Sequence, residues 1–271
     1  MYRLVICDLD GTAATFDQTV RPAVRAAMQA VVDSGQWITI STGRGYQLLK
    51  PFLPLVVVNA PLVCCNGGLI VEPTTRRILF VEPMDLPLAH DLIRLAQRDG
   101  LQMLVYLDDM ETMLEHRRGD PGFVLRRDGE FVGLANDPVA VVSRPPHKLI
   151  VLTDSPAETP VAGAHLQEYI GERARVLASS PQVLEVIMPG MSKAHSMSWL
   201  ADYLGVKQEE TVAIGDGDND VEMLEWAGLG IAMGNATPGT RVAADWVAPP
   251  VEEDGLAVAL HRFVIAPEQD T

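Results

Sequence analysis

Short apolar runs alternate with amphipathic stretches over the first part of the chain. Apolar runs at 4–7, 37–40 and 62–65 have the length of buried strands. Between the first two, apolar residues recur at helical spacing from Pro22, which is favoured in the first turn of a helix, to Gly35, which ends helices. Strands that alternate with helices in this way predict a parallel sheet with helices on its faces.

The same alternation returns in the last third of the chain. Ser192 is a suitable N-cap for an amphipathic helix that ends at Gly205. Beyond it we predict strands at 212–214 and 230–233, with a helix over 221–227 between them. We therefore expect the first and last segments of the chain to contribute strands to one shared parallel sheet.

The middle of the chain has a different pattern. It reads as loosely repeated helix–strand–strand units, with a strand expected at 103–107 and a charged, loop-rich stretch at 108–133. We predict an α/β protein with a Rossmann-like parallel-sheet core, formed by residues 1–83 and 188–271. Residues 84–187 are predicted to form an inserted α+β domain with its own small sheet.

Two carboxylates, Asp8 and Asp10, directly follow the first apolar run and precede Gly11. Ligands of open α/β sheets bind beyond the carboxyl ends of the strands, and side chains at i and i+2 of a strand point the same way. Two acids held together repel each other unless a cation or a proton joins them. The pair therefore indicates either a metal site or a proton donor, although Asp and Gly here are also typical of a plain turn.

A second acidic cluster follows the strand predicted at 212–214. It contains Asp216, Asp218, Asn219 and Asp220, of which Asp218 is expected to be a turn residue. Because both carboxylate clusters stand at strand ends, two unrelated turns explain them poorly. We therefore favour one functional site that draws on both ends of the chain.

Phosphoryl transfer needs this kind of residue set. The reaction requires an in-line nucleophile, a metal on the phosphoryl oxygens, and cationic and hydrogen-bonding partners for the equatorial charge. Thr42 follows the second predicted strand, and Lys193 opens the helix that begins after Ser192. Taken without context, Thr42 would be a strand-end hydroxyl and Lys193 a solvated helix residue.

Mg²⁺ takes six oxygen ligands and keeps several waters. Asp8 and Asp216 are candidates for two carboxylate ligands, with the backbone carbonyl of Asp10 as a third protein oxygen. Asp220 would either hold a metal-bound water or orient Lys193. The stretch from 216 also begins like a calcium loop, but Val221 and Ala227 replace the glycine and the glutamate that such a loop needs.

Charge narrows the range of partners. The 271 residues include 36 acidic and 21 basic side chains, for a net charge of −15. This balance argues against nucleic acids and anionic membrane surfaces as partners. A phosphorylated substrate remains compatible, because a metal and a few cations reverse the sign inside one cleft.

Hydropathy and cysteine content favour a folded cytoplasmic protein. No apolar stretch reaches the length of a membrane span, and an acidic residue follows the start too soon for a signal peptide. Three cysteines, of which Cys64 and Cys65 are adjacent, form no even disulfide framework and are expected to be reduced. Cys7 is a poor candidate nucleophile because the acids beside it would raise its pKa.

Four short motifs occur in a fixed order: DLDGT at 8–12, STGR at 41–44, SK at 192–193 and GDGDND at 215–220. Together they resemble the motifs of the haloacid dehalogenase superfamily of Mg²⁺-dependent phosphatases. The insert between the second and third motifs resembles the α/β cap of the Cof-type hydrolases, a group that includes many sugar-phosphate phosphatases. Three further segments carry the same resemblance: NGGLI at 66–70, HKLIVLTD at 147–154 and EMLEWAGLGIAMGNA at 222–236.

The resemblance implies a role for each matching residue. Asp8 would be the nucleophile that forms an aspartyl-phosphate, and Asp10 would protonate the leaving group and then deprotonate the attacking water. Thr42 would hydrogen bond the phosphoryl group, and Lys193 would neutralise its charge.

The resemblance also implies a metal site and a substrate site. The implied Mg²⁺ site comprises Asp8, Asp10, Asp216 and Asp220. The implied substrate-binding residues are Gly43, Arg44, Asn66 and Asn219.

The sequence thus predicts a Mg²⁺-dependent phosphomonoesterase for a small soluble phosphate ester, such as a sugar phosphate. A phosphomutase on the same scaffold stays open as an alternative, as does a non-enzymatic phospho-receiver or sugar-phosphate-binding module. Specificity is expected to reside in the insert, but no pattern identifies which of its side chains face the substrate. The candidates are Tyr106, His116, Arg117, Arg118, Arg126 and Arg127. The oligomeric state is not indicated by any pattern.

Overall fold

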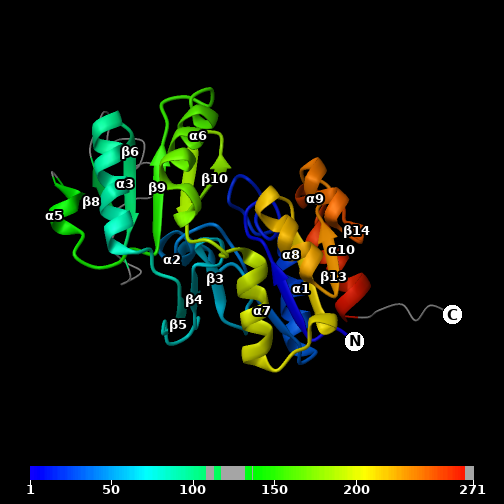
Figure 1. Ribbon diagram of the computed structural model, residues 1–271. Helices are drawn as coiled ribbons and strands as arrows, with labels where there is room; N and C mark the ends of the chain where they lie inside the picture. The colour runs from blue at the N-terminus through cyan, green and yellow to red at the C-terminus, as the bar shows by residue number, and fades with distance from the viewer. Residues whose placement is uncertain (108–112, 117–131, 136, 266–271) are drawn as a thin grey trace. The chain divides into compact units, whose positions relative to one another are not determined.

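The computed structural model describes residues 1–107, 113–116, 132–135 and 137–265 (Figure 1). These residues form two compact units. The first unit comprises Met1–Gly43, Leu49–Leu79 and Ser192–Thr271, and the second comprises Arg44–Leu48 and Phe80–Met191. Within the part of the chain described, no helix is both long enough and apolar enough to cross a membrane.

A parallel sheet of five strands forms the centre of the first unit, in the order β14-β13-β12-β1-β2. Figure 1 labels β13 and β14 of this sheet. The strands are β1 (Leu4–Cys7), β2 (Trp37–Ile40), β12 (Thr211–Gly215), β13 (Leu229–Ala232) and β14 (Trp246–Val247). β1 and β2 come from the start of the chain and the other three from its last third. The predicted shared sheet is therefore confirmed, and its fold is a Rossmann-like α/β core.

Register places the candidate site at one edge of this sheet. Cys7 lies beside Ile214 of β12 on one side and beside Ile40 of β2 on the other. Because the strands are parallel, the residues that follow them emerge together at the carboxyl edge of the sheet. Asp8 and Asp216 are thereby brought close, although 208 positions separate them in the sequence.

Helices flank the sheet in two pairs, with α1 packed against α10 and α7 against α8. The helices of this unit are α1 (Pro22–Asp33), α7 (Lys193–Leu204), α8 (Val221–Trp226), α9 (Pro238–Ala243) and α10 (Gly255–Leu260). α1 shows why these segments are helical: Val24, Ala27, Met28 and Val31 form one buried stripe.

A small second sheet follows β2. Its strands are β3 (Leu62–Cys64), β4 (Leu69–Val71) and β5 (Ile78–Val81), and β4 lies between the other two. The backbone N–H of Thr42 donates to Val63 O at 2.9 Å, which attaches the end of β2 to β3. The short helix α2 (Tyr46–Leu49) comes after β2 in the chain.

The second unit has a six-stranded sheet in the order β10-β11-β9-β6-β7-β8. Its elements are α3 (Leu86–Asp99), β6 (Gln102–Tyr106), β7 (Met113–His116), β8 (Val132–Ala135), α5 (Pro138–Val141), β9 (Lys148–Leu152), α6 (Thr159–Ile170), β10 (Arg175–Ser180) and β11 (Val183–Ile187). Apolar residues of α3 and α6, including Leu92 and Leu166, share a buried cluster with Leu149 of β9. This is the inserted α+β domain that the sequence predicts.

The stretch expected to be loop-rich contains β7 and the first residues of β8. β7 pairs antiparallel with β6, and β8 runs parallel to β7. Strand pairing depends on the partner strand more than on local propensity, which is why the charged sequence around β7 did not reveal it. The rest of this stretch lies outside the described residues.

Candidate active site

Asp8 stands directly behind β1 and is almost fully buried, with 6% of its surface exposed. Its backbone N–H donates to Ile214 O at 2.8 Å, so the β1–β12 pairing continues to this residue. Asp216 follows the last residue of β12 and is likewise buried, and Asp220 is fully buried at the N-terminal end of α8. Each side chain is thus placed by a strand end or a helix start.

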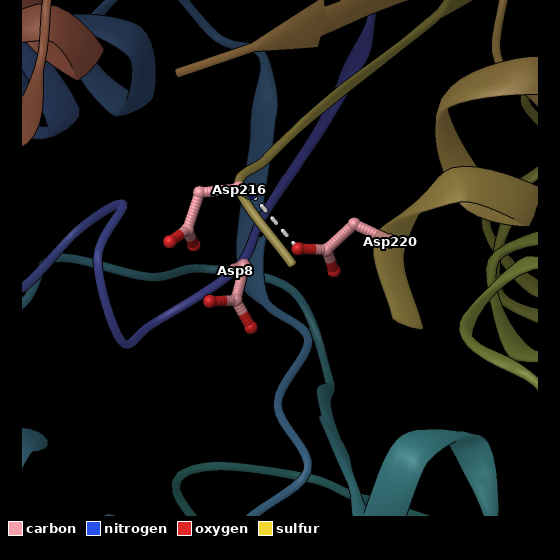
Figure 2. Close-up of side chains that lie close together, drawn as sticks. All are labelled: Asp8, Asp216 and Asp220. Atoms are coloured by element: carbon pink, nitrogen blue, oxygen red, sulfur yellow. Dashed lines mark hydrogen bonds between the residues drawn. The ribbon is translucent and has the colours of Figure 1, made fainter. Parts of the chain in front are cut away.

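The three carboxylates form one cluster (Figure 2). Asp8, Asp216 and Asp220 each offer an oxygen, and these oxygens all lie within 4.8 Å of one another. A donor set made only of carboxylate oxygens fits a hard cation such as Mg²⁺ and is a poor match to metals that prefer sulfur or imidazole. Among the described residues, the cluster therefore has the chemistry of the metal site predicted from the sequence.

Lys193 is the first residue of α7, and 1% of its surface is exposed. Its Nζ lies 2.5 Å from Asp8 Oδ1 and 2.6 Å from Asp220 Oδ1, and donates to both. Burial lowers the pKa of the Lys193 ammonium, but the charges of Asp220 and Asp8 outweigh this effect, so the pKa is raised and the side chain is cationic. Lys193 is therefore not the solvated helix residue that a lone lysine would be.

Burial and mutual repulsion disfavour ionisation of the acids. Burial raises the pKa of Asp8 well above its ordinary value; Lys193 acts against this, while Asp220 and Asp216 add to it. Burial and the charge of Asp220 raise the pKa of Asp216 to about 7. A divalent cation among the three carboxylates would favour their ionised forms.

Asp220 has two distinct sets of contacts. Its Oδ1 accepts from Lys193, and its Oδ2 accepts from the backbone N–H groups of Asp216 and Gly217, each at 3.0 Å. Figure 2 shows the bond between Asp216 and Asp220 as a dashed line. Of the two roles that the sequence left open for Asp220, these contacts support the orientation of Lys193.

Asp10 does not belong to this carboxylate cluster. It forms an isolated bridge with Ala14, and its charge is one of the influences that raise the pKa of Asp216. Asp10 therefore lies close enough to Asp216 for its charge to act on that carboxylate, without being a member of the cluster.

Thr42 and three of the four candidate substrate-binding residues meet at a turn. The turn Cys65–Gly67 follows β3, and the backbone N–H of Asn66 donates to Thr42 O at 3.1 Å. Asn219 Nδ2 donates to Asn66 Oδ1 at 2.8 Å, and a Cβ on Gly43 would lie 3.2 Å from the Asn66 amide group. The structure thus brings the second and fourth motifs together through Asn66.

Arg44 is grouped with the second unit, whereas the other site residues belong to the first. Of the insert side chains considered for specificity, Tyr106 is fully buried, with Lys148 Nζ 5.6 Å from the centre of its ring. The candidate arginines Arg117, Arg118, Arg126 and Arg127 lie outside the described residues, as does the side chain of His116.

Two contacts of Asp216 were missed by the sequence analysis. Thr12 Oγ1 donates to Asp216 Oδ1 at 3.1 Å, and Asn235 Nδ2 donates to Asp216 Oδ2 at 3.1 Å. Both residues lie within segments that carry the family resemblance, which was the available signal. Neither contact follows from spacing, because each joins separate loops.

The chain matches known proteins over most of its length. A family model described as haloacid dehalogenase-like hydrolase matches residues 5–260. A 5-amino-6-(5-phospho-D-ribitylamino)uracil phosphatase of Bacillus subtilis is 28% identical over 96% of this chain and 97% of its own. A pyridoxal phosphate phosphatase of Escherichia coli is 26% identical over 97% of this chain and 99% of its own.

A solved haloacid dehalogenase-like hydrolase from Bacteroides thetaiotaomicron has a similar structure, with a TM-score of 0.87 and 25% identity over 97% of this chain and 99% of its own. An Arabidopsis thaliana protein named as a chloroplastic endoribonuclease is 24% identical over 97% of this chain, but the chain spans only 46% of its length.

Proposed function

This chain belongs to the haloacid dehalogenase-like hydrolases and is a phosphatase of the Cof type, and on that premise we propose that it is a Mg²⁺-dependent phosphomonoesterase that works through an aspartyl-phosphate on Asp8. The observation that carries the proposal is the convergence of Asp8, Asp216 and Asp220 on one point, with Lys193 bonded to two of them. A buried carboxylate held beside a cation is suited to attack phosphorus.

The reaction would proceed in two displacements. A carboxylate oxygen of Asp8 attacks the phosphorus while the bond to the ester oxygen breaks, and Asp10 gives its proton to the departing alkoxide. Asp10 then takes a proton from water, which attacks the phosphorus of the aspartyl-phosphate and releases inorganic phosphate and free Asp8. Lys193 and Thr42 stabilise the charge of the transferring phosphoryl group.

Asp8 and Asp216 would hold the Mg²⁺ ion, with the Asp10 carbonyl as a further protein oxygen and Asp220 in support. When bound, Mg²⁺ would offset the negative charge that the carboxylates and the phosphoryl oxygens bring together.

The substrate would be a small phosphorylated metabolite such as a sugar phosphate. The phosphatases matched above are named for compounds of this size, and the net charge of −15 disfavours nucleic acids. Gly43, Arg44, Asn66 and Asn219 are the proposed substrate-binding residues. Specificity is assigned to the second unit, and a cytoplasmic location fits the three free thiols.

Hydrolysis of p-nitrophenyl phosphate tests the mechanism. Activity should require Mg²⁺ and be lost in Asp8→Asn, because an amide is not a nucleophile for phosphorus. Asp33→Asn is the matched control, since Asp33 is exposed on α1 and should leave the rate unchanged. Acid quenching during turnover should trap a phosphoprotein in the unaltered chain only. Full activity of Asp8→Asn would contradict the mechanism, and stimulation by a sugar bisphosphate without phosphate release would indicate a phosphomutase.

A further inference from the structure

Asn235 lies in the loop between β13 and α9 and joins three separate segments of the first unit. Its Nδ2 donates to Gly11 O at 2.9 Å and to Asp216 Oδ2 at 3.1 Å. Its Oδ1 accepts from the backbone N–H of Val251 at 2.9 Å. One amide group thus connects the loop after β1, the loop after β12 and the turn before α10.

Each oxygen of the Asp216 carboxylate accepts a hydrogen bond from a neighbouring side chain. Thr12 donates to Oδ1 and Asn235 donates to Oδ2. Because the two donors come from different loops, they fix the plane of the carboxylate. Each carboxylate oxygen has two acceptor positions, so each one keeps a position for a cation.

Close packing at Gly11 adds to this restraint. Gly11 has a φ of +81°, and a Cβ at this position would lie 2.2 Å from Asp216 Oδ2. The loop backbone therefore passes directly against the carboxylate that Asn235 and Thr12 hold. In this space Asp216 has little freedom to rotate away from the repulsion of Asp220.

We propose that Asn235 is a positioning residue that, together with Thr12, holds the Asp216 carboxylate in the orientation that binds the divalent cation. Asn235 would not be a ligand itself: the group that it turns toward Asp216 is its amide nitrogen, which cannot coordinate Mg²⁺, whereas its side-chain oxygen is turned toward Val251 N–H. The inference rests on the proposed function for the identity of the cation.

Calorimetric titration of the full chain with Mg²⁺ alone tests the proposal. Asn235→Ala should weaken Mg²⁺ binding by about 10- to 100-fold, the usual cost of losing a group that orients a metal ligand. With p-nitrophenyl phosphate, the rate at saturating Mg²⁺ should recover most of its original value, because the chemical groups are unchanged. The defect is therefore expected in the Mg²⁺ requirement and not in kcat.

Asn59→Ala is the matched control. Asn59 Nδ2 donates to Gln36 O at 2.9 Å, and its Oδ1 accepts from Ile38 N–H at 2.8 Å, at the end of β2 away from the site. This variant also loses two bonds to the backbone, so its stability should fall while its Mg²⁺ affinity stays unchanged. Equal loss of Mg²⁺ affinity in Asn59→Ala and Asn235→Ala would overturn the proposal.

Thr12 provides a second arm that does not depend on the folding of Asn235→Ala. Thr12→Val removes the hydroxyl at constant shape and should weaken Mg²⁺ binding, whereas Thr12→Ser keeps the donor and should restore it. Unchanged Mg²⁺ affinity in Asn235→Ala, or in Thr12→Val if the first variant does not fold, would overturn the positioning role alone. Absence of Mg²⁺ binding by the unaltered protein would instead remove the proposed function.

Discussion

The position of the charged Lys193 side chain is unfavourable for the stability of the fold. Its surface is almost wholly buried, and it stands at the N-terminal end of α7, where the helix dipole repels a cation. The contacts with Asp8 and Asp220 offset both costs. Such an arrangement is typical of a catalytic site, where a group is held for its chemistry.

Replacement of this lysine should affect activity far more than replacement of an exposed one. Lys193→Met is expected to lower kcat for p-nitrophenyl phosphate by about 10²- to 10³-fold, because it removes a charge that stabilises the transition state. Lys207→Met is the control: Lys207 is exposed and lies 3.9 Å from Glu209 in a surface pair, so kcat should not change. Similar rates in the two variants would show that Lys193 has no part in the chemistry.

Gly11 is a second residue whose effect should be specific to the site. In Gly11→Ala the added methyl group would meet Asp216 Oδ2, so the Mg²⁺ concentration needed for half-maximal activity should rise by about tenfold or more. Gly35→Ala has an almost equal φ of +82° but no atom within 4 Å, so it shares the backbone strain without the clash. Both variants should unfold at lower temperature. An equal Mg²⁺ requirement in the two would contradict the steric argument.

At the scale of elements, α7 is held to the turn Cys65–Gly67. Ser196 Oγ donates to Gly67 O at 2.7 Å, and a Cβ on Gly67 would lie 2.3 Å from Ser192 O. This close approach places the first turn of α7, and hence Lys193, against the end of β3. The side chain of Ser192 caps the helix by accepting from His195 N–H.

Loss of the contact between the helix and the turn should lower activity, because this contact positions Lys193. Ser196→Ala leaves the buried Gly67 carbonyl without this donor, which is expected to cost about 1–3 kcal/mol of stability and to lower kcat several-fold as Lys193 shifts. Ser34→Ala removes an exposed hydroxyl that donates to Ala30 O at 2.8 Å, and should change neither quantity appreciably. Urea unfolding and steady-state rates on the same samples provide the comparison. A kcat equal to that of the unaltered chain would show that α7 is positioned without this contact.

For the whole molecule, the acid-rich centre of the first unit should make stability depend on the metal. At a Mg²⁺ concentration of about 100 times the dissociation constant, binding should stabilise the fold by about 2.7 kcal/mol and raise the Tm by roughly 5–10 °C. Addition of EDTA should reverse the shift. Asp216→Asn should show little shift, because it loses a carboxylate of the cluster. A Tm that does not respond to Mg²⁺ in the unaltered chain would contradict a metal site in the folded protein.

Local patterns were sufficient for much of the core. β1, β2 and β12 are buried over most of their length, and this produces continuous apolar runs that are recognisable in the sequence. Asp8 directly follows such a run, so its place at a strand end could be predicted. β7 could not, because a short strand at 113–116 is stabilised mainly by pairing with β6.

By itself, the sequence determined the order of the elements, the interruption by an insert and the residue types that a phosphoryl-transfer site requires. These follow from local periodicity, caps and motif spacing. Tertiary structure alone decided which groups touch: that Asp220 holds Lys193, that Asn66 meets Asn219, and that Asn235 and Thr12 hold Asp216. Such contacts join loops that are brought together by sheet register. They leave no local pattern in the sequence, so they could not be predicted from it.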